Sequence, residues 1–297
     1  MGIFSVALAE MRSSGTQFRD PELFRGGYLE RSGNKIQGSV ASLISVDHLG
    51  KLDRELKDAG VMVFRLGGGS QGGSDQKGRT RFALAQCGEA GFKDYFLFDS
   101  DLFLSEKPRM FIPRVDMRSL FAFTLLPNFS ETSLVSLAAF SGVLSEALEL
   151  DRDAPLSAPA TGQSTYTFSF APREGKSPIW DHIDGQVEVD AILTGHRNGR
   201  PVAVIVESKA GESNAGSSKN TLAKHKLLYP YMALRPSIPD YIPIELVYLR
   251  AWRQTDGFHF RTAQFITEGS PNAIQGSRVL SRPRVAHIVL PLHSLAR

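Results

Sequence analysis

Two neighbouring segments of the sequence combine strand-forming residues with acidic and basic side chains. VEVDAIL supplies two acids and VAVIVESKAG supplies an acid and a lysine, namely Glu188, Asp190, Glu207 and Lys209. Asn198-Gly199 lies between them, and Asn-Gly between β-branched alternations is the strongest short-range signal for a type I′ hairpin. With these two residues as the loop, the numbers of paired positions sum to 397, so we expect Asp190 to face Glu207 and Glu188 to face Lys209.

Two acids placed opposite each other on a sheet could share a divalent cation. Such side chains have Cβ atoms roughly 5 Å apart, and two carboxylates at that distance repel each other. Mg²⁺ removes the conflict, because carboxylates, water and a substrate phosphate match its preferred coordination. Lys209 on the same face could orient a water or stabilise charge on the phosphate. The alternative interpretation is a surface hairpin in which Glu188 and Asp190 make plain ion pairs with Lys209.

The segments before this hairpin predict an α/β module over residues 1–127. Residues 45–60 have apolar side chains at helical spacing and end at Gly60, which is typical of a helix with a glycine cap. VMVFRL and TRFALAQ are predicted strands, joined by a glycine-rich surface loop. We expect this module to be separate from the rest of the chain, with a boundary near Pro127.

The second domain, over residues 128–297, is predicted to be α/β as well. A Ser/Thr-rich start and apolar side chains at helical spacing predict a long helix from Pro127 to about residue 150. Strands are predicted at TYTFSF, QVEVDAILTG and PVAVIVESKAG, then a helix around KNTLAKHKLLYPYMALR, then strands at PIELVYLRAW and FHFRTAQFI. The expected order is therefore one helix, three strands, one helix and two strands.

VEVDAIL followed by VAVIVESKAG resembles the PD-(D/E)XK nuclease superfamily, whose pattern is an acid on one strand and acid-x-Lys on the next. The resemblance extends from the helix after Pro127 to the strands near residue 265. It implies a restriction-endonuclease-like core, a central mixed β-sheet flanked by helices in the order α-β-β-β-α-β. Val189 stands where the pattern often has Pro, a change that this superfamily tolerates.

The resemblance also implies roles for particular residues. Asp190 and Glu207, with the Ser208 backbone carbonyl, would bind Mg²⁺, for which Mn²⁺ could substitute, and Lys209 would be the catalytic lysine. Many members add a Glu from the preceding helix, which leaves Glu146 and Glu149 as alternatives here. Members often also have a polar residue on the following helix that points into the site, a position that Lys224 would fill.

The implied function is a Mg²⁺-dependent DNA endonuclease acting on double-stranded DNA, most simply a type II-like restriction endonuclease that works as a homodimer. By analogy with such enzymes, the N-terminal module over residues 1–127 would recognise the DNA site or a modified base. One alternative is a structure-specific or transposon-type nuclease with the same site, and another is a DNA-binding or interaction protein that keeps the fold without catalysis. Surface solubility or DNA contact would explain the remaining basic side chains of interest, which are Arg65, Arg79, Arg81, Lys219 and Lys226.

Charge and composition agree with a folded protein that meets an anionic partner. The formal net charge is +3, and three Lys or Arg against ten Asp or Glu in residues 128–195 give −7, whereas fourteen against six in residues 196–297 give +8. Chance clustering explains this distribution as well as a cation site beside a phosphate-binding surface does. The single cysteine, Cys87, and the lack of a long apolar stretch lead us to expect a cytoplasmic protein without a membrane segment.

Overall fold

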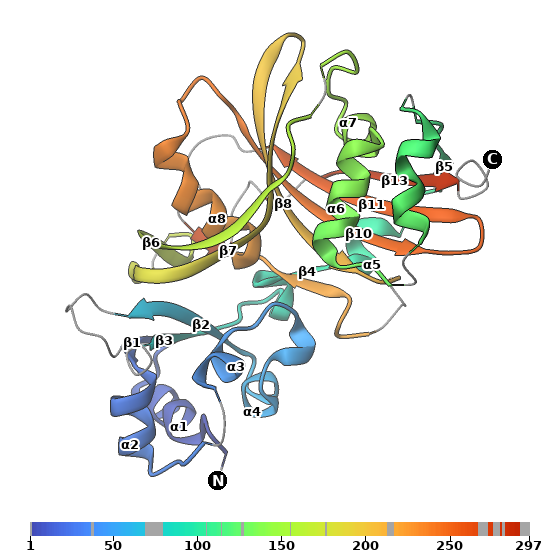
Figure 1. Cartoon of the computed structure of the whole chain (residues 1–297). Coiled ribbons are helices and arrows are strands. Elements are labelled where there is room, and N and C mark those ends of the chain that lie inside the picture. Colours follow the sequence, from blue (N-terminus) through green and yellow to red (C-terminus); the bar gives the residue numbers. More distant parts are fainter. Residues whose placement is uncertain are drawn as a thin grey trace.

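A large mixed β-sheet, covered by helices on both faces, forms the centre of the computed structural model (Figure 1). The structure describes residues 2–36, 39–68, 80–104, 106–113, 115–125, 128–154, 156–175, 177–212, 217–266, 273–275, 280 and 283–291. Within these ranges, no helix is both long enough and apolar enough to cross a membrane. The class predicted from sequence, mixed α/β with a central mixed sheet flanked by helices, is confirmed.

The helices are short and the strands of the second half are long. The helices are α1 (Ser5–Ser14), α2 (Leu29–Ser32), α3 (Val40–Ile44), α4 (Arg54–Asp58), α5 (Asp99–Phe103), α6 (Glu131–Phe140), α7 (Val143–Ala147) and α8 (His225–Leu234). The strands are β1 (Phe18–Leu23), β2 (Val61–Gly68), β3 (Thr80–Gln86), β4 (Phe96–Phe98), β5 (Arg109–Met110), β6 (Ala160–Arg173), β7 (Trp180–Arg197), β8 (Arg200–Ala210), β9 (Thr221–Ala223), β10 (Ile244–Arg253), β11 (Gly257–Ile266), β12 (Ala273–Gln275) and β13 (Arg284–Pro291).

The hairpin of β7 and β8 has the predicted turn and register. Asn198 has φ 52° and Gly199 has φ 73°, the left-handed values that a type I′ turn requires. Their N–H groups both donate to the Asp151 carboxylate at 2.8 Å, which fixes the turn from outside the hairpin. Pairing then runs from Arg197 opposite Arg200 to Ala191 opposite Val206, so every pair sums to 397 as expected.

The eight strands of the large sheet lie in the order β12-β6-β7-β8-β10-β11-β13-β5. β8 and β10 are parallel and α8 connects them, whereas β7 and β8 are antiparallel. Successive residues of β8 point to opposite faces. Ala203 and Ile205 pack in the core that contains α8, and Val204 and Val206 pack in the core that contains α6 and α7.

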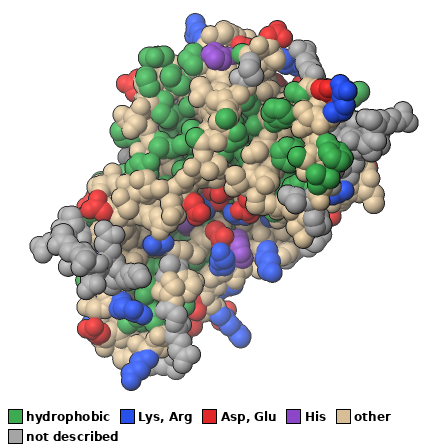
Figure 2. Space-filling model, in the orientation of Figure 1, with side chains coloured by type: hydrophobic (Ala, Val, Ile, Leu, Met, Phe, Trp, Pro, Cys, Tyr) green, Lys and Arg blue, Asp and Glu red, His purple; other side chains and the backbone are tan. Residues whose placement is uncertain are grey.

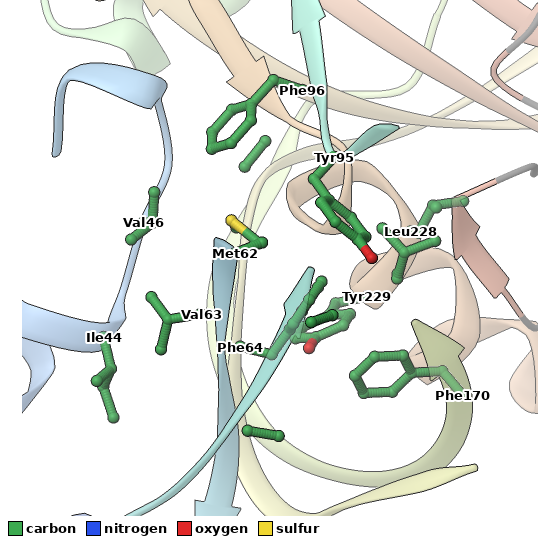
Figure 3. Close-up of a cluster of buried hydrophobic side chains, with 14 of the residues drawn as sticks. Ile44, Val46, Met62, Val63, Phe64, Tyr95, Phe96, Phe170, Leu228 and Tyr229 are labelled. Carbon is green, nitrogen blue, oxygen red and sulfur yellow. The ribbon is translucent and has the colours of Figure 1, made fainter. Parts of the chain in front are cut away.

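The N-terminal elements share a hydrophobic core with the large sheet. β1, β3 and β2 form a three-stranded sheet, and Phe64 of β2 packs against aromatic rings from three other segments (Figure 3). Its ring centroid lies 5.4 Å from that of Tyr95, 5.9 Å from that of Phe170 and 5.7 Å from that of Trp180.

Two strands that precede the boundary predicted at Pro127 pair with strands that follow it. β4 pairs with β9, and β5 extends the large sheet beside β13. The division into two domains stays a prediction, but the contacts between the two parts are extensive. At Gly67 of β2 a Cβ atom would lie 2.0 Å from the Ile183 carbonyl oxygen of β7, so the two strands approach more closely than any side chain allows.

Three of the predicted helices differ from the structure in their bounds. The helix expected after Pro127 is two helices, because Gly142, with φ 85°, ends the first and begins the second. The helix expected over 45–60 begins only at Arg54, where the Asp53 carboxylate accepts the Glu55 N–H at 2.8 Å. The segment around 219–235 begins with β9, and α8 starts after it at His225.

Candidate functional site

β7 leaves its partner β8 at Asp190. The ladder with β8 ends at Ala191, and the pairing of β7 with β6 shifts register between Ile192 and Val189. Val189 belongs to the core on the α8 face and Ala191 to the core on the α6 face, although residues two apart on a regular strand share a face. Asp190 therefore lies on a β-bulge, a feature that redirects a side chain and is frequent beside active sites.

Beyond the last backbone pair of β7 and β8, the Asp190 side chain makes a hydrogen bond to β8. Its Oδ2 accepts the N–H of Ser208 at 2.7 Å, so the carboxylate reaches across to β8 next to Glu207. Ser208 itself is fully buried. Asp190 is close enough to Glu207 that its charge contributes to raising the pKa of Glu207. The ladder stops one pair short of the predicted pair of Asp190 and Glu207, and Asp190 reaches β8 through its side-chain contact with Ser208.

Glu207 is a buried carboxylate held between two lysines. Its Oε1 lies 3.1 Å from Nζ of Lys209 and 3.5 Å from Nζ of Lys226, and the residue is 2% exposed. Burial raises the pKa of Glu207 to about 7, although the charges of Lys226 and Lys209 act to lower it. The cost of burying this acid is therefore only partly offset by the two ammonium groups, and a further cation beside it would be stabilised.

Glu131, which sequence reasoning missed, brings helix α6 to the site. Its Oε2 lies 3.5 Å from Nζ of Lys209, and its Oε1 accepts the N–H of Ala210 at 3.3 Å. Ser130 caps the helix by accepting the Ser133 N–H at 3.1 Å, which places Glu131 in the first turn. Burial lowers the pKa of Lys209, but the nearby carboxylates outweigh it and raise that pKa above its ordinary value. The capping serine just before an acid was the signal available in the sequence.

The two helix acids considered from sequence lie elsewhere. Glu146 binds Arg109 at 2.5 Å and Arg152 at 2.6 Å, and Glu149 binds Arg284 at 2.6 Å. The carbonyl of Leu148, next to Glu149, accepts from the Arg197 guanidinium at the turn end of the β7–β8 hairpin. Asp190 precedes Arg197 by seven residues on β7, which is roughly 23 Å of extended strand. Glu131 is thus the helix acid that reaches the site.

Two further predicted residues take places different from those expected. Glu188 pairs with Gln163 of β6 rather than with Lys209, and its exposed carboxylate lies 3.9 Å from Nζ of Lys226. Lys224 precedes α8 and is partly buried, and this burial lowers its pKa although the charge of Asp94 acts to raise it. Lys226 is the residue of α8 that reaches Glu207.

The basic residues proposed as DNA contacts are scattered. Lys226 lies in the site, and the Arg65 guanidinium donates to Ser45 Oγ at 3.1 Å beside it. Arg81 is on β3 opposite Leu66 and Leu23. The Lys219 carbonyl accepts from Arg250, while Arg79 lies outside the described residues.

Asp190 and Glu207 suit a hard cation that needs few protein ligands. In the part of the chain that the structure describes, no three His, Cys, Asp or Glu side chains are grouped as a metal site. Mg²⁺ is commonly held by one or two carboxylates and completes its shell with water and phosphate, whereas a structural Zn²⁺ site needs four protein ligands. The buried, raised-pKa carboxylate of Glu207 beside Asp190 therefore fits Mg²⁺ and does not fit structural zinc.

Acidic, basic and histidine side chains gather where the N-terminal elements meet the large sheet (Figure 2). Among curated proteins, no sequence matches this chain. A family model described as "Domain of unknown function (DUF6997)" matches residues 98–279, a range that includes β7, β8, α6 and α8 and with them Asp190, Glu207, Lys209, Glu131 and Lys226. This match covers more than half of the chain, and the chain belongs to the DUF6997 family.

Proposed function

We propose that the protein is a Mg²⁺-dependent DNA endonuclease of the PD-(D/E)XK superfamily. The observation that carries the proposal is the meeting of Asp190, Glu207 and Lys209 where β7 separates from β8. The chain order α6-α7-β6-β7-β8-β9-α8-β10, with β8 parallel to β10, supports it, because apart from the added strand β9 it follows the restriction-endonuclease-like order that the resemblance implies.

In this proposal each residue has a defined task. Asp190, Glu207 and the Ser208 carbonyl would hold Mg²⁺, or Mn²⁺ in its place. The bound ion would lower the pKa of an attacking water, and its positive charge would stabilise the negative charge of the phosphate. Lys209 orients that water and stabilises negative charge, while Glu131 holds the Lys209 ammonium in position from α6. Lys226, which already contacts Glu207, lies where it can bind a neighbouring phosphate.

The substrate class we propose is double-stranded DNA, cut in the manner of a type II-like restriction endonuclease by a homodimer, since cutting both strands needs two active sites. A structure-specific or transposon-type nuclease would use the same residues. A non-catalytic DNA-binding protein is the alternative of a different class. The burial and raised pKa of Glu207, beside the partly buried Asp190, favour catalysis, because a binding surface has no need of such a costly arrangement.

The test is incubation of the purified protein with long DNA in Mg²⁺ or in EDTA, followed by mapping of the ends. We expect cleavage only with the ion, and a loss of about 100-fold or more in Asp190→Asn, Glu207→Gln and Lys209→Ala. Glu149→Gln is the matched control, because that acid is bound to Arg284 away from the site. A Lys209→Ala protein that cuts as fast as the wild type would contradict the assignment.

The same experiment separates the alternatives. Discrete fragments from long DNA would support a restriction endonuclease, and a preference for branches or ends would support a structure-specific nuclease. Binding without cleavage in every divalent ion tried would support the non-catalytic protein.

A further inference from the structure

A small pocket lies beside the candidate catalytic residues, between the N-terminal elements and the large sheet. Its volume is about 200 Å³. β2 contributes one wall, β7 a second and α8 a third, with lining side chains that include Arg65, His182, Glu188, His225, Lys226 and Tyr229. Nζ of Lys226 lies 3.9 Å from Glu188 and 3.5 Å from Glu207, so the pocket adjoins the place where chemistry is proposed.

Arg65 supplies a positive charge that no acid of the described residues neutralises. Its guanidinium donates to Ser45 Oγ at 3.1 Å, and no ion pair of Arg65 is found in the described part of the chain. The two acids that line the pocket are already engaged, Asp47 with Lys51 at 3.0 Å and Glu188 with Lys226 at 3.9 Å. Burial lowers the pKa of Arg65, which is the cost of holding this charge without a counter-ion. An anion such as phosphate would relieve that cost.

Tyr229 and His225 line the same pocket, and each carries a buried polar atom without a hydrogen-bond partner among the described residues. Tyr229 is 7% exposed, and its hydroxyl has no hydrogen-bond partner among the described residues. Nδ1 of His225 is buried and unpartnered in the same part of the chain. Buried polar groups are normally hydrogen-bonded, so two unpartnered atoms on residues that line one cavity favour a ligand that brings donors and acceptors of its own.

The two histidines of the pocket are neutral hydrogen-bonding groups. Burial lowers the pKa of His182 to about 4 and that of His225 to about 3. Nδ1 of His182 lies 3.3 Å from the Tyr166 carbonyl, which can only accept, so Nδ1 donates and Nε2 is left as an acceptor. A neutral ring offers one donor and one acceptor, which is the chemistry that reads the edge of a nucleobase.

Flat rings surround these groups. His182 stacks on Phe168 with the planes 14° apart, and the Tyr229 ring lies 5.1 Å from those of both His182 and His225. Figure 3 labels Tyr229 and Phe64 in the same cluster of buried side chains. The volume of about 200 Å³ is below that of pockets for drug-sized ligands, which begin at roughly 300 Å³, so its size favours a small group such as one heterocycle.

We propose that this pocket binds a single unpaired nucleotide, with its phosphate on Arg65 and its base among Tyr229, His182 and His225. That the nucleotide belongs to the DNA being cut rests on the proposed function. An enzyme that inspects one base takes it out of the stack into such a pocket and reads it by hydrogen bonds and aromatic contact. The pocket would then couple recognition of one base to the adjacent acids.

The first arm of the test measures binding of the four deoxynucleoside 5′-monophosphates by calorimetry in EDTA. We expect at least one to bind, with a Kd raised about tenfold or more in Arg65→Gln and about fivefold in Tyr229→Phe. Tyr229→Phe removes only a hydroxyl that has no partner among the described residues, so its fold should be at least as stable as that of the wild type. Arg54→Gln is the control for charge, since that side chain is 92% exposed.

Two comparisons identify which part of the nucleotide is recognised. Inorganic phosphate alone should bind more weakly than the best nucleotide, and the nucleoside without phosphate should lose its sensitivity to Arg65→Gln. Equal affinity for phosphate and nucleotide would overturn the base-binding part. Absence of nucleotide binding, or equal binding by wild type, Arg65→Gln and Tyr229→Phe, would overturn the proposal.

The second arm identifies the source of the nucleotide. Duplex DNA with one mismatched 2-aminopurine should gain fluorescence on binding if that base leaves the stack, and Tyr229→Phe should reduce the gain. A fluorescence gain seen only when 2-aminopurine lies in a single-stranded end would show that the pocket binds the terminal nucleotide of a DNA strand. Cleavage of DNA with no effect of the pocket variants would refute this inference and leave the nuclease standing, whereas pocket-dependent nucleotide binding without cleavage would do the reverse.

Discussion

Nζ of Lys209 lies 3.5 Å from Oε2 of Glu131 and so ties the end of β8 to the first turn of α6. The same ammonium lies 3.1 Å from Glu207, so Glu131 contacts the lysine proposed to be catalytic. A residue of this kind acts by holding another in position, and its loss commonly costs about 10- to 100-fold in activity.

We therefore expect Glu131→Gln to cut DNA about 10- to 100-fold more slowly than the wild type while binding DNA in EDTA with unchanged affinity. Cleavage rates and binding isotherms, with thermal unfolding as a check on folding, make the measurement. Glu149→Gln serves as the control because its acid pairs with Arg284 instead. Glu131→Gln activity equal to that of this control would show that the contact with Lys209 has no catalytic role.

Asp190 should govern affinity for the ion. An ion at about 100 times its Kd stabilises the folded state by about 2.7 kcal/mol, so Mg²⁺ or Mn²⁺ should raise the thermal midpoint of the wild type and EDTA should reverse the effect. Asp190→Asn should lose most of the increase, because it removes one of two carboxylates. Asp58→Asn, whose side chain is 72% exposed on α4, should respond as the wild type does. Identical metal responses in all three proteins would exclude Asp190 as a ligand.

Asp99 and Arg250 form a buried ion pair between α5 and β10. Nε of Arg250 lies 2.6 Å from the Asp99 carboxylate, and Arg250 and Asp99 are 4% and 1% exposed. Asp99→Ala leaves the arginine buried without its partner, which should lower the free energy of unfolding by about 3–5 kcal/mol in urea denaturation. Asp101 lies on the same helix as Asp99 and makes an exposed ion pair with Lys93. Asp101→Asn breaks this pair and should lower the free energy of unfolding by less than about 1 kcal/mol. Similar losses in both variants would show that burial does not set the cost.

His182 predicts loss of stability in mild acid. The unfolded chain takes up a proton near pH 6.5 whereas the folded one does so only near pH 4, so the unfolded state binds more protons within this window. Stability should fall as the pH drops through the window, by about 3 kcal/mol from this residue, and should be independent of its titration above pH 6.5.

Urea denaturation of the wild type and His182→Gln across that pH range provides the measurement. The carboxylates titrate in both proteins, so the difference between them isolates the histidine. Parallel stability curves for the two proteins would mean that His182 is not held neutral.

Local signals explain what the sequence could predict. The Asn198-Gly199 turn and the β-branched residues on either side determine the register of β7 and β8, because both depend on residues adjacent in the chain. The bulge at Asp190 arises from pairing with β6, which no pattern in β7 itself reveals. The three-strand, helix, two-strand order was similarly available from periodicity.

The contributions of the helices were not predictable because they depend on where each helix starts. One long helix after Pro127 would leave Glu146 and Glu149 as reasonable alternatives, but the break at Gly142 turns α7 away toward β13. In the same way β9 delays the start of α8 to His225, and Lys226 rather than Lys224 reaches Glu207. Both outcomes follow from tertiary contacts that override a plausible local pattern.

The shared core around Phe64 has a consequence for how an endonuclease of the proposed kind could change its target sequence. Where a DNA-recognition domain is joined to a nuclease domain by a linker, the whole domain can be replaced by another. Here the ring of Phe64 packs against those of Phe170 and Trp180, and β2 approaches β7 at Gly67, where no side chain would fit. New specificity in such an enzyme would have to arise by substitution within the existing surface, residue by residue, because the elements before and after the predicted boundary share one hydrophobic core.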